Sequence, residues 1–296
     1  MLESINYIGD DEVTTLSELQ LKQLIKDVSA VDTLTYCATI GLYDVLDVLL
    51  KDQSTKSSRK VHNIIWATDN YTEFDLCDPH SEMTLESILT VHSMSGIQPR
   101  SLKSKEIQKQ RTKSKAEVFT PTWIVKKQND AVDENYQSDD LETYVSRKWL
   151  ELTCGEAPYM TTRYDMTSAL FINVSNRVGF VDRKLARISK DITNMAEWNR
   201  LAILAYKSSY GFEWSGDSLL LARLNLLFTY VDHFIAKWNS FPTMGMLLDI
   251  AEIISYNLFQ MDGLKYIKPL SESKPKRTKI MDWSTYKMEY FDKGVN

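Results

Sequence analysis

The sequence contains little cysteine, no pair of adjacent prolines and no long apolar run. Its cysteines, Cys37, Cys77 and Cys154, lie far apart and form no Cys-x-x-Cys pair. This pattern argues against a disulfide framework and against a structural zinc site, and it fits a reducing compartment. No window reaches the ~18 consecutive apolar residues of a membrane span, and the acidic amino terminus is unlike a secretory signal. We therefore expect a cytoplasmic protein that makes no membrane contact.

An overall excess of basic charge is also missing, because the 296 residues carry a formal net charge of -5. Any surface that binds nucleic acid must therefore be local. Two basic clusters qualify. Residues 100–115 hold seven Lys or Arg against the single acid Glu106, and residues 274–279 read KPKRTK. Both clusters are open to two interpretations, a solvated charged surface or contacts with phosphate groups.

Length and hydrophobic periodicity predict two domains. With 43% hydrophobic residues, the chain can bury one substantial core or two modest ones. Apolar residues recur at spacings of three and four between Thr15 and Lys51, which indicates amphipathic helices, and Val61–Tyr71 reads as a buried strand followed by a loop. We expect a mainly helical region with one strand at 1–100, a basic linker at 101–115 and an α/β domain at 116–296.

Within the predicted α/β domain, three strand-like runs each end in a polar or small-residue turn. The first, LELTCGEAP, brings Cys154 and Gly155 into a turn that allows a ligand to approach the backbone closely. The second ends at Glu213, just before an apolar helix, and the third delivers Asp262 into a Gly turn. Ligands bind outside the carboxyl ends of strands in open α/β sheets, so these ends predict one binding site.

Four motifs occur in an order that resembles a known family. They are AEVFTP, LTCGEAP, YGFEW followed by LLLARLNLL, and NLFQMDG, between about Ile64 and Trp283. Together they resemble adenine-specific DNA methyltransferases of restriction-modification systems, in particular the modification subunits. The resemblance implies a Rossmann-like, S-adenosylmethionine-dependent methyltransferase domain. The implied reaction transfers a methyl group directly to the exocyclic amine of an adenine flipped out of double-stranded DNA.

The resemblance also implies roles for individual residues. Cys154 and Gly155 match the Gly-rich first motif, Glu213 would hold the cofactor ribose, and Asp262 would contact the cofactor adenine. Asp182, in the segment before Glu213, is a rival for the ribose contact. The segment that covers the methionine part of the cofactor is matched by Phe119, Thr120 and Pro121.

The reactive motif of the family, an acid or amide followed by two prolines and an aromatic residue, does not occur in this sequence. If the strands are circularly permuted, one candidate for the reactive motif is Asp69, Asn70 and Tyr71, which follow an apolar strand and would be the catalytic residues. Asp-Asn-Tyr after a strand is equally an ordinary turn. The alternative is a cofactor-binding half, or a catalytically silent DNA- or partner-binding subunit. Its partner would be a second methyltransferase subunit, a specificity subunit or a restriction endonuclease.

A metal-dependent nuclease is a further alternative. Asp262 followed by Glu272-x-Lys274 has the order of acids and lysine that hold a divalent ion near a phosphate. However, Glu272 and Lys274 lie in a Pro- and Ser-rich stretch, whereas this chemistry needs rigid placement. We therefore expect no metal site.

Overall fold

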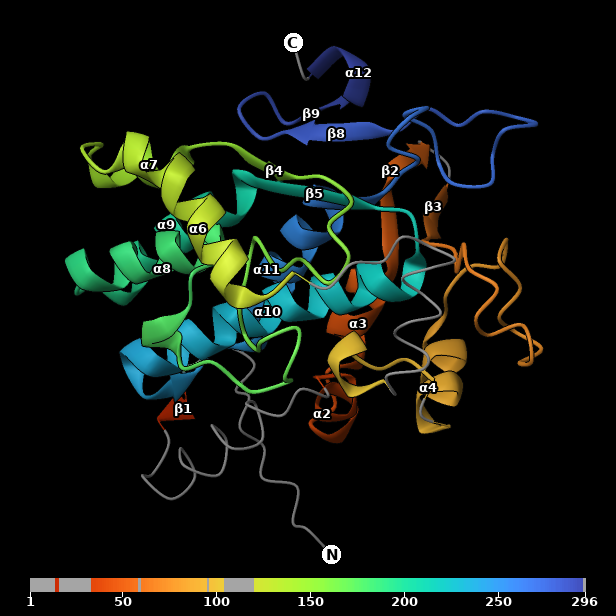
Figure 1. Ribbon diagram of the computed structural model, residues 1–296, viewed down its shortest axis with the longest axis horizontal. Coiled ribbons are helices and arrows are strands. Elements are labelled where there is room, and N and C mark those ends of the chain that lie inside the picture. Colours follow the sequence, from red (N-terminus) through yellow and green to blue (C-terminus); the bar gives the residue numbers. More distant parts are fainter. Residues whose placement is uncertain (1–13, 16–32, 58–59, 95, 104–119, 295–296) are drawn as a thin grey trace, which may run out of the picture.

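The computed structural model describes residues 14–15, 33–57, 60–94, 96–103 and 120–294 and has a mixed α/β fold (Figure 1). Its centre is a three-stranded parallel sheet with the strand order β4-β5-β7. In the register, Leu150 pairs with Tyr210, and Phe212 pairs with Phe259. The strands are β4 (Trp149–Glu151), β5 (Ser209–Glu213) and β7 (Leu258–Gln260). Because the strands are parallel, their carboxyl ends lie at the same edge, as the sequence predicted.

Helices connect the parallel strands. Between β4 and β5 lie α8 (Phe180–Asp191) and α9 (Met195–Lys207). Between β5 and β7 lie α10 (Gly216–Trp238) and α11 (Met244–Asn257). Of the described helices, α10 alone is long and apolar enough to cross a membrane, but 94% of its most apolar stretch is buried inside the protein. It therefore occupies the position of a core helix.

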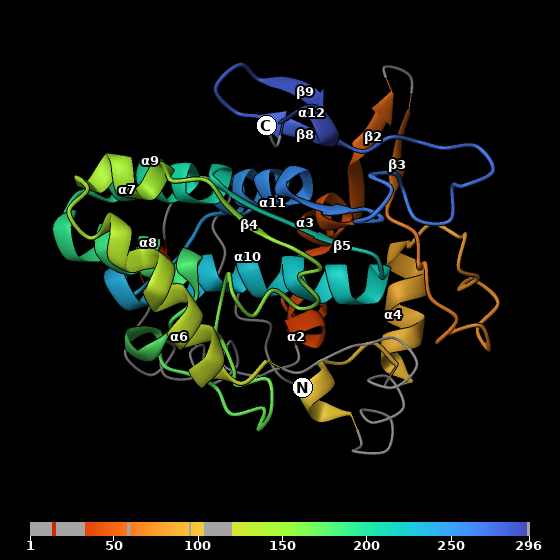
Figure 2. The ribbon, with the colours of Figure 1, turned by 45° about the horizontal axis from the view of Figure 1, so that its top comes forward.

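The two faces of the sheet are covered differently. The helices contribute the main hydrophobic cluster, which includes Leu258 of β7. The opposite face carries Phe212 and Phe259, which pack in a separate cluster with Phe291. Figures 1 and 2 show a carboxy-terminal hairpin and short helix on that side of the sheet and α10 on the other. These elements are β8 (Lys279–Asp282), β9 (Lys287–Tyr290) and α12 (Phe291–Gly294).

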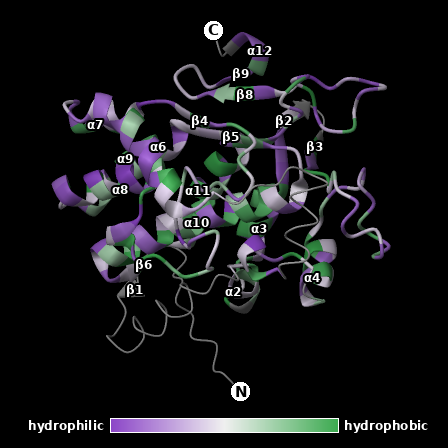
Figure 3. Ribbon diagram, viewed as in Figure 1, coloured by the Kyte–Doolittle hydropathy of each residue, from purple (hydrophilic) through white to green (hydrophobic). Residues whose placement is uncertain are grey.

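The described amino-terminal residues share the main hydrophobic cluster with α10 and α11. Of the two helical runs expected before Lys51, the one at 42–49 corresponds to α3 (Tyr43–Leu50), whereas the one at 16–25 lies outside the described residues; α2 (Thr33–Thr39) is a further helix. The strand expected at 61–71 is shorter. It belongs to a hairpin of β2 (Lys51–Ser57) and β3 (Lys60–Asn63), and residues 64–71 form an isolated bridge at Ile65 and turns. Figure 3 shows apolar residues along α3 and α10.

The remaining elements are short. Directly after Thr120, Pro121 stands at the N-cap of α6 (Thr122–Asp133). The basic cluster at 100–115 is described only at its start, where Arg100–Leu102 form the 3-10 helix η1. The others are β1 (Thr14–Thr15), α4 (Leu85–Ser93), η2 (Glu134–Tyr136), α7 (Leu141–Ser146), η3 (Val174–Asn176) and β6 (Ser240–Phe241).

Candidate functional site

The turn after β4 is a compact loop that presents backbone N–H groups to neighbouring carboxylates. Thr153, Gly155 and Ala157 all have positive φ angles, of 46°, 55° and 62°. The N–H of Cys154 donates to the carbonyl of Phe212 at 2.8 Å, which extends the pairing with β5 beyond β4. A Cβ atom added to Gly155 would meet no atom within 4 Å. The positive φ of Gly155 favours glycine there, as it costs a residue with a Cβ atom some strain, and the space beside Gly155 is open.

Glu213 ends the central strand and contacts this turn directly. Its Oε2 accepts a hydrogen bond from the N–H of Gly155 at 2.8 Å, and its Oε1 accepts one from Ser215 at 3.2 Å. Burial raises the pKa of the Glu213 carboxyl, although the N–H donors and the positive charge of Arg100 oppose the shift. The structure thus brings together Gly155 and Glu213, two residues that the sequence assigned to one site.

Glu151 is a second buried carboxyl at this edge, and the sequence reasoning missed it. It ends β4, and its two oxygens accept hydrogen bonds from the N–H groups of Tyr159 and Met160 at 3.2 and 3.0 Å. Burial raises its pKa to about 8, and the nearby Glu213 adds to the shift. The signal in the sequence was its position as the last residue of an apolar strand. Glu151 and Glu213 together hold both ends of the turn.

The raised pKa of Glu151 predicts a pH-dependent stability. An acid with a higher pKa in the folded state binds its proton more tightly there, so stability falls as pH rises from about 4.5 towards 8. We expect Glu151→Gln to reduce this fall by about 1–3 kcal/mol. Urea unfolding at pH 5 and pH 8 measures the effect, with Glu252→Gln on the exposed face of α11 as the control. An equal pH dependence in both variants would contradict the prediction.

Asp262 follows β7 and caps a turn with its own side chain. Its Oδ1 accepts hydrogen bonds from the N–H groups of Leu264 and Lys265 at 2.9 and 3.1 Å. The preceding residue, Met261, donates its N–H to the carbonyl of Glu213 at 3.0 Å. Asp262 therefore lies next to Glu213 at the sheet edge, with one carboxylate oxygen committed to the turn.

A cavity of about 440 Å³ opens beside Glu213. One wall comes from β5 and the residues after it, and the other comes from the loop that the sequence singled out as a catalytic candidate. The lining residues are Ala67, Thr68, Asp69, Pro79, Glu213, Trp214, Ser215 and Leu270. Two independently predicted sites, the ribose-binding acid and the Asp69 loop, therefore face the same space.

Gln260 of β7 forms hydrogen bonds to the chain around residues 64–71, which we call the Asp69 loop. Its Oε1 accepts the N–H of Ile65 at 2.9 Å, and its Nε2 donates to the carbonyls of Ile65 and Trp214, each at 2.8 Å. Gly216 approaches the same segment, because a Cβ atom added there would lie 2.2 Å from the Ile65 carbonyl oxygen. The close approach of α10 to residue 65 thus depends on glycine.

The three residues of the catalytic candidate are placed differently. Asp69 is exposed and lines the cavity, whereas Asn70 is half-buried and does not line it. Tyr71 is only 4% exposed. Its ring lies against Trp66, with centroids 5.1 Å apart, and its hydroxyl donates to Asp217 at 2.8 Å. In this conformation the face of Tyr71 is not available for stacking on a base.

The segment matched to the methionine part of the cofactor is described only in part. Phe119 lies outside the described residues, while Thr120 and Pro121 precede α6. The next residue, Thr122, donates to the carboxylate of Asp165 through its N–H and its hydroxyl, at 3.3 and 2.7 Å. These contacts fix the start of α6 against the chain that follows β4.

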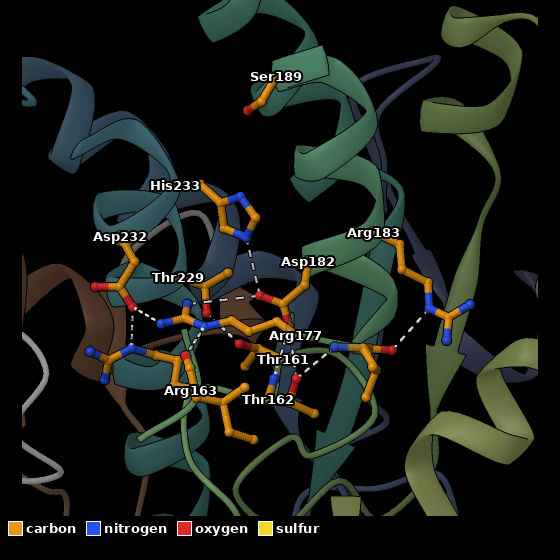
Figure 4. Close-up of polar contacts among 12 residues, drawn as sticks. Thr161, Thr162, Arg163, Arg177, Asp182, Arg183, Ser189, Thr229, Asp232 and His233 are labelled. Carbon is orange, nitrogen blue, oxygen red and sulfur yellow. Dashed lines mark hydrogen bonds and ion pairs between the residues drawn. The ribbon is translucent and has the colours of Figure 1, made fainter. Parts of the chain in front are cut away.

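Asp182, the rival ribose contact, lies in a buried polar network between α8 and α10 (Figure 4). It is 1% exposed, and its Oδ2 accepts the N–H of Thr162 at 2.8 Å. His233 and Arg177 approach its other oxygen at 3.3 and 3.8 Å. These contacts make Asp182 part of the helical core, so of the two candidates for the ribose contact Glu213 is the one that lies at the sheet edge.

The residues of the nuclease hypothesis do not form a cluster of acids. Lys265 lies between two of them, with its Nζ 3.3 Å from Glu272 and 3.8 Å from Asp262. Lys274 is exposed in the same loop. Across the described parts of the chain, no group of three His, Cys, Asp or Glu side chains is placed to hold a metal ion.

Comparisons with protein-family models, with curated proteins and with solved structures find no match to this chain.

Proposed function

We propose that this chain binds S-adenosylmethionine at the carboxyl edge of its parallel sheet and acts in the cytoplasm as a DNA adenine methyltransferase or as its cofactor-binding subunit. In this proposal β4, β5 and β7 are three strands of a Rossmann-like methyltransferase sheet. The observation that carries it is the hydrogen bond between Glu213, at the end of the central strand, and the N–H of Gly155, in the turn of the neighbouring strand. An acid beside a Gly turn at this edge is the arrangement that binds a ribose in open α/β sheets.

The residues at the edge have the chemistry that such a cofactor needs. Glu213 presents carboxylate oxygens, which accept hydrogen bonds from ribose hydroxyls. Asp262 lies on the next strand end, where it would contact the adenine, and Thr120 and Pro121 would cover the methionine part. When bound, S-adenosylmethionine supplies an activated methyl group. The chain's own residues hold and orient the cofactor, and the buried carboxyls keep the turn in place.

The basic loop next to the cavity supports DNA as the partner. Residues 264–293, which include this loop and the hairpin of β8 and β9 after it, contain eight Lys or Arg against four Asp or Glu, a net charge of +4 in a chain whose total is -5. Lys274, Lys276 and Arg277 are exposed, while Leu270 of the same loop lines the cavity with Glu213. A local positive surface of this kind attracts phosphate groups. In this proposal the loop contacts the DNA backbone beside the cofactor.

Asp69 is our candidate for orienting the target amine, because its side chain lines the cavity. The burial of Tyr71 instead favours the second candidate function, a catalytically silent subunit. The outer edge of β4 supports the same candidate, since no described strand pairs with it and Leu152 beside it is 62% exposed. A strand from a partner subunit would cover this edge.

The test is calorimetric titration with S-adenosylmethionine, combined with a tritiated-methyl transfer assay on mixed-sequence double-stranded DNA. If the chain is a complete enzyme, we expect both cofactor binding and methyl transfer. Asp69→Ala should then bind the cofactor as wild type does but transfer methyl groups at least about 100-fold more slowly, because a positioned catalytic group is lost. Binding without transfer identifies the cofactor-binding subunit. The absence of binding would refute the proposal.

A further inference from the structure

Arg100 is held close to the turn after β4 by contacts of its backbone. Its N–H donates to Oε1 of Glu156 at 2.8 Å, at the start of η1. Glu156 is 3% exposed, and its other oxygen accepts the hydroxyl of Tyr164 at 2.7 Å. Asn225 of α10 donates to the Glu156 carbonyl and to the Tyr164 hydroxyl, each at 3.0 Å. Through these contacts Glu156 anchors Arg100 to the turn after β4.

The guanidinium group of Arg100 lies at the first turn of α10, with Nη2 3.4 Å from the hydroxyl of Ser218. The same end of the helix provides Ser215, whose N–H binds Glu213. The positive charge of Arg100 offsets part of the rise that burial causes in the pKa of Glu213. A cation is therefore fixed beside the acid and the Gly turn that form the candidate cofactor site.

S-adenosylmethionine has a free carboxylate at its amino-acid end. Arg binds carboxylates with two parallel hydrogen bonds, and the geometry of its planar group is suited to this purpose. We propose that Arg100 binds the carboxylate of the cofactor and so distinguishes the amino-acid end from the nucleoside end. This inference rests on the proposed function, because it assigns a residue to one end of the same ligand. Glu213 and Arg100 then hold the ribose and the carboxylate of one molecule.

The experiment compares two ligands that differ by one group, S-adenosylmethionine and its decarboxylated form, which keeps the nucleoside, the sulfonium and the amine. We expect the full-length wild-type protein to bind S-adenosylmethionine about 10- to 100-fold more tightly, since hydrogen bonds to charged groups are worth that much in affinity. Arg100→Gln should remove most of this preference while leaving the affinity for the decarboxylated ligand within about threefold, because its backbone contact to Glu156 is kept. Arg100→Lys, which retains the charge, should restore part of the preference.

Arg200→Gln on the exposed surface of α9 is the matched control, and it should leave both affinities unchanged. The proposal for Arg100 is overturned if wild type does not discriminate between the ligands, or if Arg100→Gln keeps the preference or weakens both ligands equally. Failure of wild type to bind either ligand would refute the proposed function itself. The two failures are therefore distinguishable in one set of titrations.

Discussion

Glu213→Ala is expected to lower the affinity for S-adenosylmethionine by about 100-fold or more, because two hydrogen bonds from ribose hydroxyls to a carboxylate would be lost together. The change also removes the acceptor for the N–H of Gly155, so the turn after β4 loses one of its two anchors. Since the ribose is common to both ligands, the affinity for decarboxylated S-adenosylmethionine should fall equally. Calorimetric titration of each ligand measures the effect.

Two variants provide the controls for Glu213→Ala. Glu252→Ala removes an exposed carboxylate from α11 and should leave the affinity unchanged. Glu213→Gln retains one acceptor oxygen and should bind with an affinity between those of wild type and Glu213→Ala. If a folded Glu213→Ala protein binds S-adenosylmethionine with wild-type affinity, the cofactor does not contact Glu213.

Asp232→Ala is expected to destabilise the protein by about 3–5 kcal/mol, because it removes a buried carboxylate that accepts hydrogen bonds from two buried arginines. Asp232 Oδ2 accepts hydrogen bonds from Arg163 at 2.8 Å and from Arg177 at 2.5 Å (Figure 4). The side chains of both arginines are at most 1% exposed. Urea unfolding measures the loss, and Asp249→Ala on the exposed surface of α11 is the control. A loss below about 1 kcal/mol would contradict this account of the network.

The same pair of arginines gives Asp232 a predictable response to acid. Burial alone would raise the pKa of its carboxyl, but Arg163 and Arg177 outweigh burial and hold the pKa below the usual value. A depressed pKa in the folded state contributes stability above the unfolded value, near 4, and this contribution is lost as pH falls further. The wild-type protein should therefore lose stability more steeply than Asp232→Ala below pH 4.

Local patterns in the sequence predicted the main elements of the sheet. The apolar run before Glu213 and the helical periodicity after it correspond to β5 and α10, and the turns at Gly155 and Asp262 follow β4 and β7. These features depend on neighbouring residues, so periodicity and turn chemistry are sufficient to find them. The convergence of three strand ends followed from the expectation of a parallel sheet.

The features that sequence reasoning missed depend on long-range contacts. Asp182 was a rival candidate for the ribose because it is an acid in the segment before Glu213, yet it pairs with His233, 51 positions later. The burial of Tyr71 follows from its contact with Asp217, 146 positions away. Nothing in the local pattern reveals such partners. The role of Glu156 was hidden for the same reason, since its contact to Arg100 spans 56 positions.

The three hydrogen bonds of Gln260 have a consequence for how the protein assembles during synthesis. Gln260 holds Ile65, which precedes it by 195 positions. The ribosome adds about 5–20 residues per second, so roughly 10–40 seconds pass between the synthesis of Ile65 and that of Gln260. During this time the Asp69 loop lacks the side chain that binds it to the sheet. Contacts of such large sequence separation also form slowly, because a long chain must close first. The cavity beside Glu213 is therefore among the last parts of the nascent protein to acquire its shape.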